Sequence, residues 1–345
     1  MSIDLTGRLD VAAEYVFAAP PRVEGMRDAV NMWFWDDRGR FGFPRVAVEA
    51  VAPQWDTHEM QMTLAFAEGR ILRNWESGPA HPTRGPGGLP TLFGAGPMEF
   101  EMVGPFRRYR TTFKGTAIDT TFEALLKGMT DTRRVDLEYE VECDTAIPPW
   151  VQGTMSDDAR RLMSSSVEGE FMGGDRLEQL MRVQGRVKVD GLERTFTGGG
   201  LRVRRQGVRK FAGFWGHCWQ SALFPSGRGF GYIAYPPRPD GVPTYNEGYL
   251  FLGEGEIIPA RVVEAPWLTQ LDFQGQDLSL TLESKLGRTR IKGELVMAAP
   301  LLPIKGSPIS IPPLLQSIGR FHWEGETAYG MTERSNLAER IKGLD

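Results

Sequence analysis

The feature that most constrains the fold is an alternation of apolar and polar residues that returns in several parts of the chain. Residues 135–142 read VDLEYEVE, so the apolar side chains point one way and the acidic ones the other. Residues 59–66 and 277–282 repeat the pattern. A period of two is typical of an antiparallel strand with one buried and one solvated face. The sequence therefore predicts a mainly β, antiparallel fold with few short helices.

Turn signals between the predicted strands agree with this fold class. Asp190-Gly191 separates two strand-like segments, and this dipeptide is typical of a type I′ hairpin, which needs positive φ at both positions. The chain also contains 41 glycines and 24 prolines, as expected where turns join many short strands. An all-β protein of 345 residues is long enough for two domains.

Two strand-turn patterns occur in the same order in both halves of the chain. The turn Gly39-Arg40 has a counterpart in Gly227-Arg228, and MTLAFAEGR at residues 62–70 resembles LTLESKLGR at residues 280–288. Two matches in one order predict a pair of homologous β domains. We place them at residues 1–170 and 171–345.

Composition and motifs exclude several function classes. A net charge of −4 and a pI near 5.8 argue against general affinity for nucleic acid. No apolar run reaches the ~20 residues of a membrane span, and the first residues do not resemble a signal peptide, so we expect a soluble cytoplasmic protein. Cys143, Cys218 and four scattered histidines lack ligand spacing, and no phosphate-binding loop is found. We expect no metal and no cofactor. The oligomeric state is not determined by the sequence.

The segment Phe214–Tyr232 carries the strongest functional signal. Trp215, His217 and Trp219 alternate onto one face of a predicted strand, so an imidazole is placed between two indoles. An echo at residues 31–43 contains Trp33 and Trp35. Two interpretations of His217 remain open: a core histidine bonded to a backbone carbonyl, or a group that transfers a proton or polarises a ligand in an aromatic cavity.

Two carboxylates are candidates to work with His217. Glu247 lies in the segment TYNEGY, where Tyr245 shares its strand face, and Glu333 lies in the C-terminal segment WEGETAYGMTERS. A carboxylic acid in an apolar pocket has a raised pKa and can protonate an alkene or a carbonyl group near neutral pH. The alternative is that each carboxylate is a structural partner of an arginine.

A basic run follows the Asp190-Gly191 hairpin. On a strand, Arg202 and Arg204 share one face, whereas Arg205 and Arg209 share the other, with Lys210 next in the chain. Two interpretations stay open for these side chains. They form a solvated or ion-paired face, or they bind the carboxylate of a substrate through a bidentate arginine.

Residues 177–231 resemble the second domain of the AttH and carotenoid 1,2-hydratase-like tandem lipocalin-like proteins. Gly200, Arg202, Gly207 and Arg209 keep the frame of that family's Gly-x-Arg-Asp-His-Ser-Trp-Gly-x-Arg stretch, although residues 203–206 differ from it. The closing segment is also similar to the family's Gly-x-x-Glu ending, through Gly330 and Glu333.

The hydratases of this group are similar to the chain at one further point. His217 and Trp219 match their His-x-Trp pair, and Tyr245 matches the tyrosine of their Tyr-x-Asp acid, which is replaced here by Asn246-Glu247. The resemblance implies catalytic roles for His217, Glu247, Tyr245 and Glu333.

The resemblance implies two lipocalin-like domains, and an eight-stranded barrel of this kind encloses about one small ligand. We expect a hydrophobic small molecule of isoprenoid, polycyclic or fatty-acyl type in an apolar barrel cavity. The side chains expected to contact it are Trp215, Trp219, Trp33, Trp35, Arg202 and Arg209. Two alternatives stay open: a cofactor-free hydratase, isomerase or cyclase that uses His217 and a buried acid, and a structural protein without a cavity.

Overall fold

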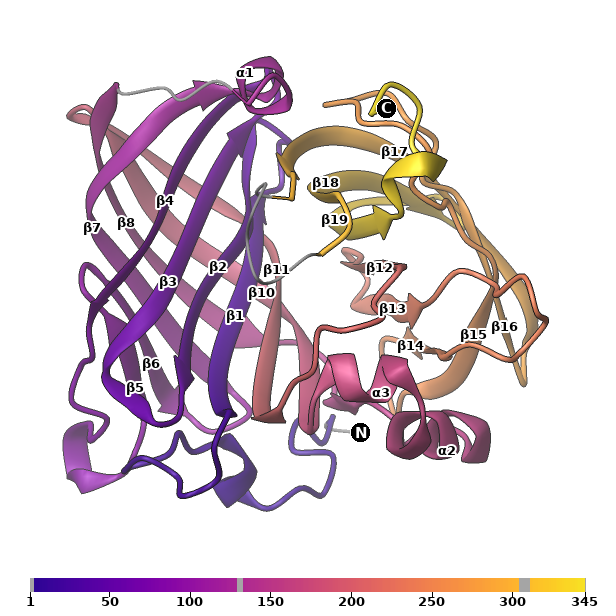
Figure 1. The fold of residues 1–345 in the computed structure, drawn as a ribbon, viewed down its shortest axis with the longest axis horizontal. Coiled ribbons are helices and arrows are strands. Elements are labelled where there is room, and N and C mark those ends of the chain that lie inside the picture. The colour runs from indigo at the N-terminus through magenta and orange to yellow at the C-terminus, as the bar shows by residue number, and fades with distance from the viewer. Residues whose placement is uncertain (1–2, 129–132, 304–310, 345) are drawn as a thin grey trace.

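Antiparallel strands form most of the protein, and they make two closed β-structures that lie side by side (Figure 1). The computed structural model describes residues 3–128, 133–303 and 311–344. The first sheet consists of β1 (Met26–Asp36), β2 (Phe41–Val51), β3 (Gln54–Phe66), β4 (Arg70–Pro79), β5 (Leu92–Ala95), β6 (Met98–Gly104), β7 (Arg108–Thr121), β8 (Arg134–Thr145), β9 (Trp150–Val151), β10 (Asp175–Val189) and β11 (Leu192–Val208).

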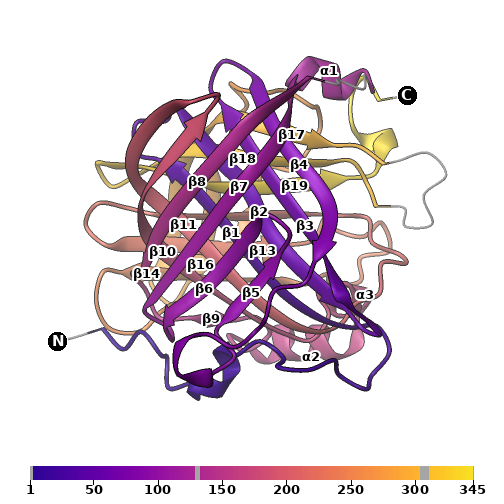
Figure 2. The ribbon, with the colours of Figure 1, turned by 90° about the vertical axis from the view of Figure 1, so that its left-hand side faces the viewer.

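Eight strands of this sheet close into a ring because β4 pairs with β7 as well as with β3. The order around this first barrel is β1-β2-β3-β4-β7-β8-β10-β11, and β11 returns to pair with β1. Strands β5 and β6 extend the sheet beyond β7. Figure 2 looks onto the outer face of this barrel, with β7 and β8 crossing the view.

The second barrel is built from consecutive strands, each paired with the next, and β19 closes it against β12. Its strands are β12 (Gly216–Leu223), β13 (Arg228–Ala234), β14 (Asn246–Leu252), β15 (Ile258–Glu264), β16 (Leu280–Ser284), β17 (Gly287–Leu301), β18 (Leu314–Trp323) and β19 (Glu326–Asn336). The predicted fold class, two lipocalin-like β domains with few helices, is confirmed.

The helices are short and lie outside the barrels. They are α1 (Phe122–Leu126), α2 (Asp157–Ser165), α3 (Val167–Met172), η1 (Val11–Glu14), η2 (Pro86–Gly88) and η3 (Ala338–Arg340). Ser156 and Ser166 cap α2 and α3 through hydrogen bonds from Ala159 N and Gly169 N, which satisfies main-chain donors that a helix start leaves free. Both helices lie on the segment between β9 and β10, below the second barrel in Figure 1.

The alternation read from residues 135–142 is confirmed in β8. Val135, Leu137, Tyr139 and Val141 are buried inside the first barrel with the other core side chains, whereas the acidic residues between them are more exposed. The Asp190-Gly191 turn between β10 and β11 has φ values of 46° and 83°, as a type I′ turn requires.

The change from the first barrel to the second lies later in the chain than the domain boundary predicted after residue 170. Strands β10 and β11 pair with β8 and β1, so residues 175–208 complete the first barrel. The second barrel begins at Gly216. A hairpin signal in the sequence identifies two strands that pair with each other. It does not identify the further strand with which each of them also pairs.

The two Gly-Arg turns occupy equivalent places, since each lies in the hairpin that opens its barrel in chain order. The second sequence match does not. MTLAFAEGR spans the third and fourth strands of the first ring, whereas LTLESKLGR spans the fifth and sixth strands of the second. That second resemblance reflects a common hairpin pattern rather than an equivalent position.

Gly39 and Gly227 provide a matched test of how closely the barrels pack. Both have left-handed φ, 67° and 90°, so alanine at either position costs about 1–2 kcal/mol. A Cβ at Gly39 would also lie 2.5 Å from Cζ of the Tyr329 ring on the second barrel, whereas at Gly227 the nearest atom is 3.8 Å away. We expect Gly39→Ala to lower the free energy of unfolding by at least about 1 kcal/mol more than Gly227→Ala, because of this overpacking. Urea unfolding of both variants tests this, and equal losses would contradict the close contact.

Candidate functional site

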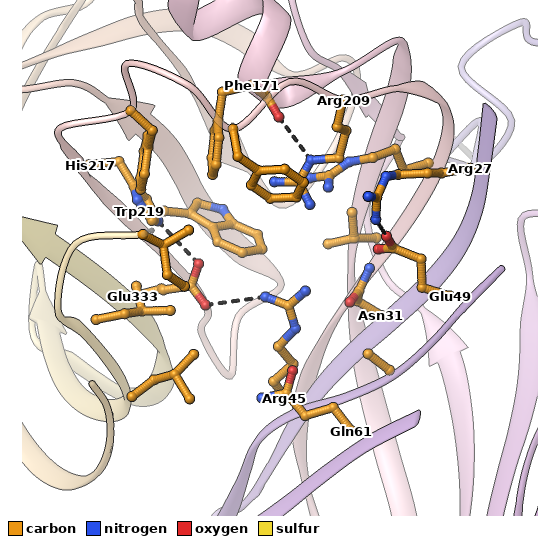
Figure 3. A pocket seen from close by; sticks show the side chains of 18 of the residues that line it. Arg27, Asn31, Arg45, Glu49, Gln61, Phe171, Arg209, His217, Trp219 and Glu333 are labelled. Atoms are coloured by element: carbon orange, nitrogen blue, oxygen red, sulfur yellow. Dashed lines mark hydrogen bonds and ion pairs between the residues drawn. The ribbon is translucent and has the colours of Figure 1, made fainter. Parts of the chain in front are cut away.

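A cavity of about 250 Å³ lies between the outer faces of the two barrels (Figure 3). The first barrel supplies side chains from β1, β2, β3, β4, β10 and β11, and the second barrel supplies them from β12, β13, β17, β18 and β19. The loop around Phe211 and Phe214, together with Phe171 of α3, completes the wall. The cavity that contains His217 is therefore formed by both barrels.

Strand alternation explains which side chains reach this cavity. On β1, Met32 and Phe34 pack inside the first barrel, which sends Trp33 outward, where it meets Trp219 edge-on at 5.9 Å between ring centroids. On β12, Gln220 reaches across the second barrel to the Leu278 carbonyl oxygen. His217 and Trp219 consequently lie on the outer face of β12 and line the cavity.

His217 is held at both ring nitrogens. Its Nε2 lies 3.1 Å from Glu333 Oε1, and its Nδ1 lies 2.8 Å from Ser335 Oγ. Ser335 Oγ also accepts the main-chain N–H of His217 at 3.0 Å, which leaves the hydroxyl hydrogen free to donate to Nδ1. Since β12 and β19 are neighbours, with His217 opposite Ser335 and Trp219 opposite Glu333, this arrangement follows from strand register.

Glu333 connects the histidine to both barrels. Its Oε2 accepts a hydrogen bond from Gln316 Nε2 at 2.9 Å and lies 3.7 Å from Nη1 of Arg45 on the first barrel. Burial alone raises the pKa of this carboxyl, but the His217 hydrogen bond and the Arg45 charge more than offset it and lower the pKa to about 2. Glu333 is thus ionised near neutral pH and does not have the raised pKa expected for a general acid.

Arg45 reaches the cavity through an irregularity in β2. In the pairing of β1 with β2, Met32 lies opposite Val46 and Phe34 lies opposite Phe43. Pro44 and Arg45 of β2 therefore both face the single residue Trp33 of β1. Arg45 has a φ of 88°, which is unfavourable for a side chain with a Cβ and costs of order 1–3 kcal/mol. Pro44 next to it is the sequence signal for such a bulge, since proline cannot donate to a strand ladder. Arg45 was not among the site residues predicted from the sequence.

Arginines give the cavity its electrostatic character. Arg27, Arg45, Arg176, Arg205 and Arg209 all line it. Burial lowers the pKa of Arg205 well below its usual value, and burial together with the charges of Arg45, Arg27 and Arg176 lowers the pKa of Arg209 to about 9. Crowded cations in a site that excludes water destabilise one another's charged forms.

The other predicted ligand contacts are divided between the cavity and the surrounding packing. Trp33, Trp219 and Arg209 line the cavity. Trp35 packs against Gly199, where a Cβ would be only 2.9 Å from its indole. Trp215 donates from Nε1 to the Pro236 carbonyl oxygen at 3.3 Å.

Arg202 lies at a different place. It forms a buried ion pair with Glu14 of η1, and its guanidinium carbon is 4.2 Å from the Tyr109 ring centroid. Arg204 similarly pairs with Asp28. These two side chains face the interior of the first barrel, as the alternation of β11 predicts, and do not line the cavity between the barrels.

Glu247 and Tyr245 form a separate cluster. Tyr245 Oη donates to Glu247 Oε2 at 2.5 Å, and the carboxylate also accepts hydrogen bonds from Trp150 Nε1 and from the main-chain N–H groups of Gly153 and Met155. Neither residue lines the cavity that contains His217. The structure therefore brings Glu333, and not Glu247, to His217.

In the part of the chain that the structure describes, no group of three or more His, Cys, Asp or Glu side chains is placed to hold a metal ion. Within the same residues, no helix is long and apolar enough to cross a membrane.

Solved structures with the same fold agree with the resemblance seen in the sequence. A candidate AttH protein (NE1406) from Nitrosomonas europaea matches with a TM-score of 0.56 and 13% identity, over 92% of this chain and 94% of that one. CghA, in a structure determined with Sch210972, matches with a TM-score of 0.52 and 10% identity, over 91% of this chain and 89% of that one. The predicted AttH-like resemblance is thereby confirmed for the fold.

Sequence comparison places the chain in one family. The search of curated proteins gave no match. The model of the family described as "Domain of unknown function (DUF7064)" matches residues 16–338, which include nearly all of both barrels and the cavity between them. The chain therefore belongs to the DUF7064 family.

Proposed function

We propose that the protein binds a hydrophobic small molecule in the cavity between its two barrels. The observation that carries this proposal is a cavity of about 250 Å³ walled by Trp33, Trp219, Phe171 and Phe214. Ligand sites in proteins are concave, rich in aromatic side chains and about 300–1,000 Å³ in volume, so this cavity suits a compact, ring-containing ligand or one that protrudes from it. The structure of CghA with Sch210972 agrees with a ligand-binding use of this fold.

The aromatic wall is held in place before any ligand arrives. Trp219 Nε1 donates to Glu178 Oε2 at 3.1 Å, and the guanidinium of Arg176 stacks 4.4 Å from the Trp219 ring centroid. Near His217, the rings of Phe171 and Phe214 are stacked with centroids 3.8 Å apart, and the Phe214 centroid is 5.5 Å from that of His217. A wall whose side chains are already ordered loses little conformational entropy when a ligand binds, which favours affinity.

The paired arrangement of His217 and Glu333 favours a second candidate, chemistry on the bound ligand. Both ring nitrogens of His217 are engaged, with Glu333 and with Ser335, so transfer of a proton to a ligand requires one of these hydrogen bonds to break. Glu333, ionised near neutral pH, would stabilise an imidazolium cation in such a step. Engagement of both nitrogens in the free protein makes ligand binding the better-supported function. Mass spectrometry of ligands before and after incubation separates the two, because only an enzyme returns a changed molecule.

Filling the cavity tests the binding function. Ala47 lines the cavity from β2, and phenylalanine at this position would occupy part of its volume. We expect Ala47→Phe to weaken binding of the neutral apolar probe N-phenyl-1-naphthylamine at least ~10-fold, a change equivalent to about 1.4 kcal/mol. Quenching of tryptophan fluorescence by the probe measures the affinity, because Trp33 and Trp219 line the site.

The matched control is Val263→Phe, at an exposed position of β15. It adds the same ring away from the cavity, so probe affinity should stay at the wild-type value. Equal affinity in wild type and Ala47→Phe would place the ligand elsewhere. Absence of binding by any apolar probe, without a rise in melting temperature, would overturn the proposed function.

A further inference from the structure

We propose that the ligand is an apolar carboxylate whose charged group binds to Arg205 and Arg209; this inference rests on the proposed function and names the class of its ligand. The first observation is the balance of charge in the cavity. Three of its arginines have carboxylate partners: Arg27 pairs with Glu49, Arg45 with Glu333, and Arg176 with Glu178. Among the described residues, Arg205 and Arg209 have no carboxylate partner within 4.0 Å. Two positive charges of the cavity are therefore not neutralised by a neighbouring carboxylate.

Arg205 is the more unusual of the two. Its side chain is buried, with 6% of the residue exposed, and its Nε has no hydrogen-bond partner among the residues described. An unpaired cation removed from water destabilises a fold by several kcal/mol. A buried guanidinium beside an open cavity therefore lacks the anion that would offset this loss.

Arg209 is oriented by aromatic rings. Its guanidinium carbon lies 4.7 Å from the ring centroid of Phe171 and 4.8 Å from that of Phe211, and Nε donates to the Phe171 carbonyl oxygen at 2.8 Å. The rings cover the flat sides of the guanidinium, so the remaining N–H groups are available in its plane, the geometry in which arginine binds a carboxylate. Figure 3 shows Arg209 at the edge of the cavity beside Phe171.

The opposite side of the cavity limits the charge of the ligand. Glu333 is an ionised carboxylate held by His217 and Arg45, and it lines the same cavity. A dianion such as a phosphate monoester would be repelled by Glu333, whereas a single carboxylate at Arg205 and Arg209 leaves that side to the apolar part of the ligand. Glu59 also lines the cavity and has no ion-pair partner among the described residues, but it is exposed, and its charge acts on Arg27.

Pairs of a carboxylate and its methyl ester, which differ in charge and by one methyl group, test the inference. Titration calorimetry would compare 2-naphthoate with methyl 2-naphthoate, and dodecanoate with methyl dodecanoate. We expect each acid to bind at least ~10-fold more tightly than its ester, as charge-assisted hydrogen bonds to the buried Arg205 and the partly buried Arg209 imply. Arg205→Met and Arg209→Met should each remove most of this preference, whereas Arg261→Met, at an exposed ion pair on β15, should keep it.

Stability distinguishes a ligand-binding role of Arg205 from a structural one. Arg205→Met removes a buried unpaired cation, so the melting temperature of the free variant should rise by at least ~2 °C while the preference for acids is lost. A lower melting temperature would assign Arg205 to the fold and overturn the inference. Acids and esters that bind equally well would overturn it too, but would leave the proposed function intact. If neither acids nor esters bind, both proposals fail.

Discussion

Replacing Glu333 by glutamine is expected to lower the free energy of unfolding by about 3–5 kcal/mol at neutral pH, because it leaves the partly buried Arg45 guanidinium without a carboxylate partner. Glu333 is the acceptor for His217 and Gln316 and the carboxylate nearest to Arg45. An amide oxygen can keep one of these hydrogen bonds, but it cannot neutralise the Arg45 guanidinium. Chemical denaturation of wild type and variant at pH 7 measures the difference.

The same carboxylate makes the wild-type protein sensitive to acid. The pKa of Glu333 is lowered from 4.5 to about 2 in the folded state. Its ionised form therefore adds to the free energy of unfolding in full above pH 4.5, and this addition is lost as the pH falls toward 2. At about 1.4 kcal/mol per pKa unit the contribution is roughly 3 kcal/mol. The stability difference between wild type and Glu333→Gln should therefore shrink across this pH range.

Glu326 is a suitable control for Glu333. It forms an ion pair with Arg228 at 2.8 Å, but at the rim of the second barrel, where solvent screens the charges. Glu326→Gln should change stability by no more than about 1 kcal/mol. If Glu333→Gln were as mild as this control at pH 7, the network around His217 would not connect the barrels energetically.

Replacing Glu247 by alanine should be equally damaging, but for a different reason. Its carboxylate accepts hydrogen bonds from Trp150 Nε1, from Tyr245 Oη and from the N–H groups of Gly153 and Met155. Each donor left without an acceptor costs about 1–3 kcal/mol, and four donors lose theirs, so we expect a total loss of at least about 4 kcal/mol. Calorimetric unfolding, together with probe binding to the fraction that remains folded, would measure both properties.

Tyr245→Phe is the milder partner of this variant. It removes the hydroxyl that bonds to Glu247 but leaves the carboxylate to accept from the other three groups, so we expect a loss of about 1 kcal/mol. Neither variant should alter ligand affinity in the folded state, since neither residue lines the cavity. A Glu247→Ala protein with wild-type stability but without ligand binding would instead support the site role that the sequence suggested.

The fold was largely predictable because its signals are local. The alternation in β8 and the Asp190-Gly191 turn require no knowledge of distant residues, and both are confirmed. The division of the chain was less accessible. Strands β10 and β11 close the first barrel, and pairing between distant strands leaves no trace in the residues that form the hairpin.

The site was predicted in part. His217, Trp219, Trp33, Arg209 and Glu333 all line the cavity. Arg45 and Arg176 were not identified, since isolated arginines on strands have no motif. Glu247 and Glu333 were both candidate partners of His217, and strand register places Glu333 opposite Trp219, two residue pairs along the ladder from His217. Proximity in sequence to a matching tyrosine does not determine which carboxylate faces a given side chain.

The sequence by itself determined that the chain is antiparallel β, where hairpins turn, and which side chains share a strand face, because a period of two is a property of the backbone alone. Only the tertiary structure decided what each face meets. All eight residues of β12 are buried, so hydrophobicity does not distinguish the interior of the second barrel from its contact with the first. The packing of one barrel on the other made the outer face, with His217 and Trp219, into the wall of a cavity, and brought arginines from distant strands around it.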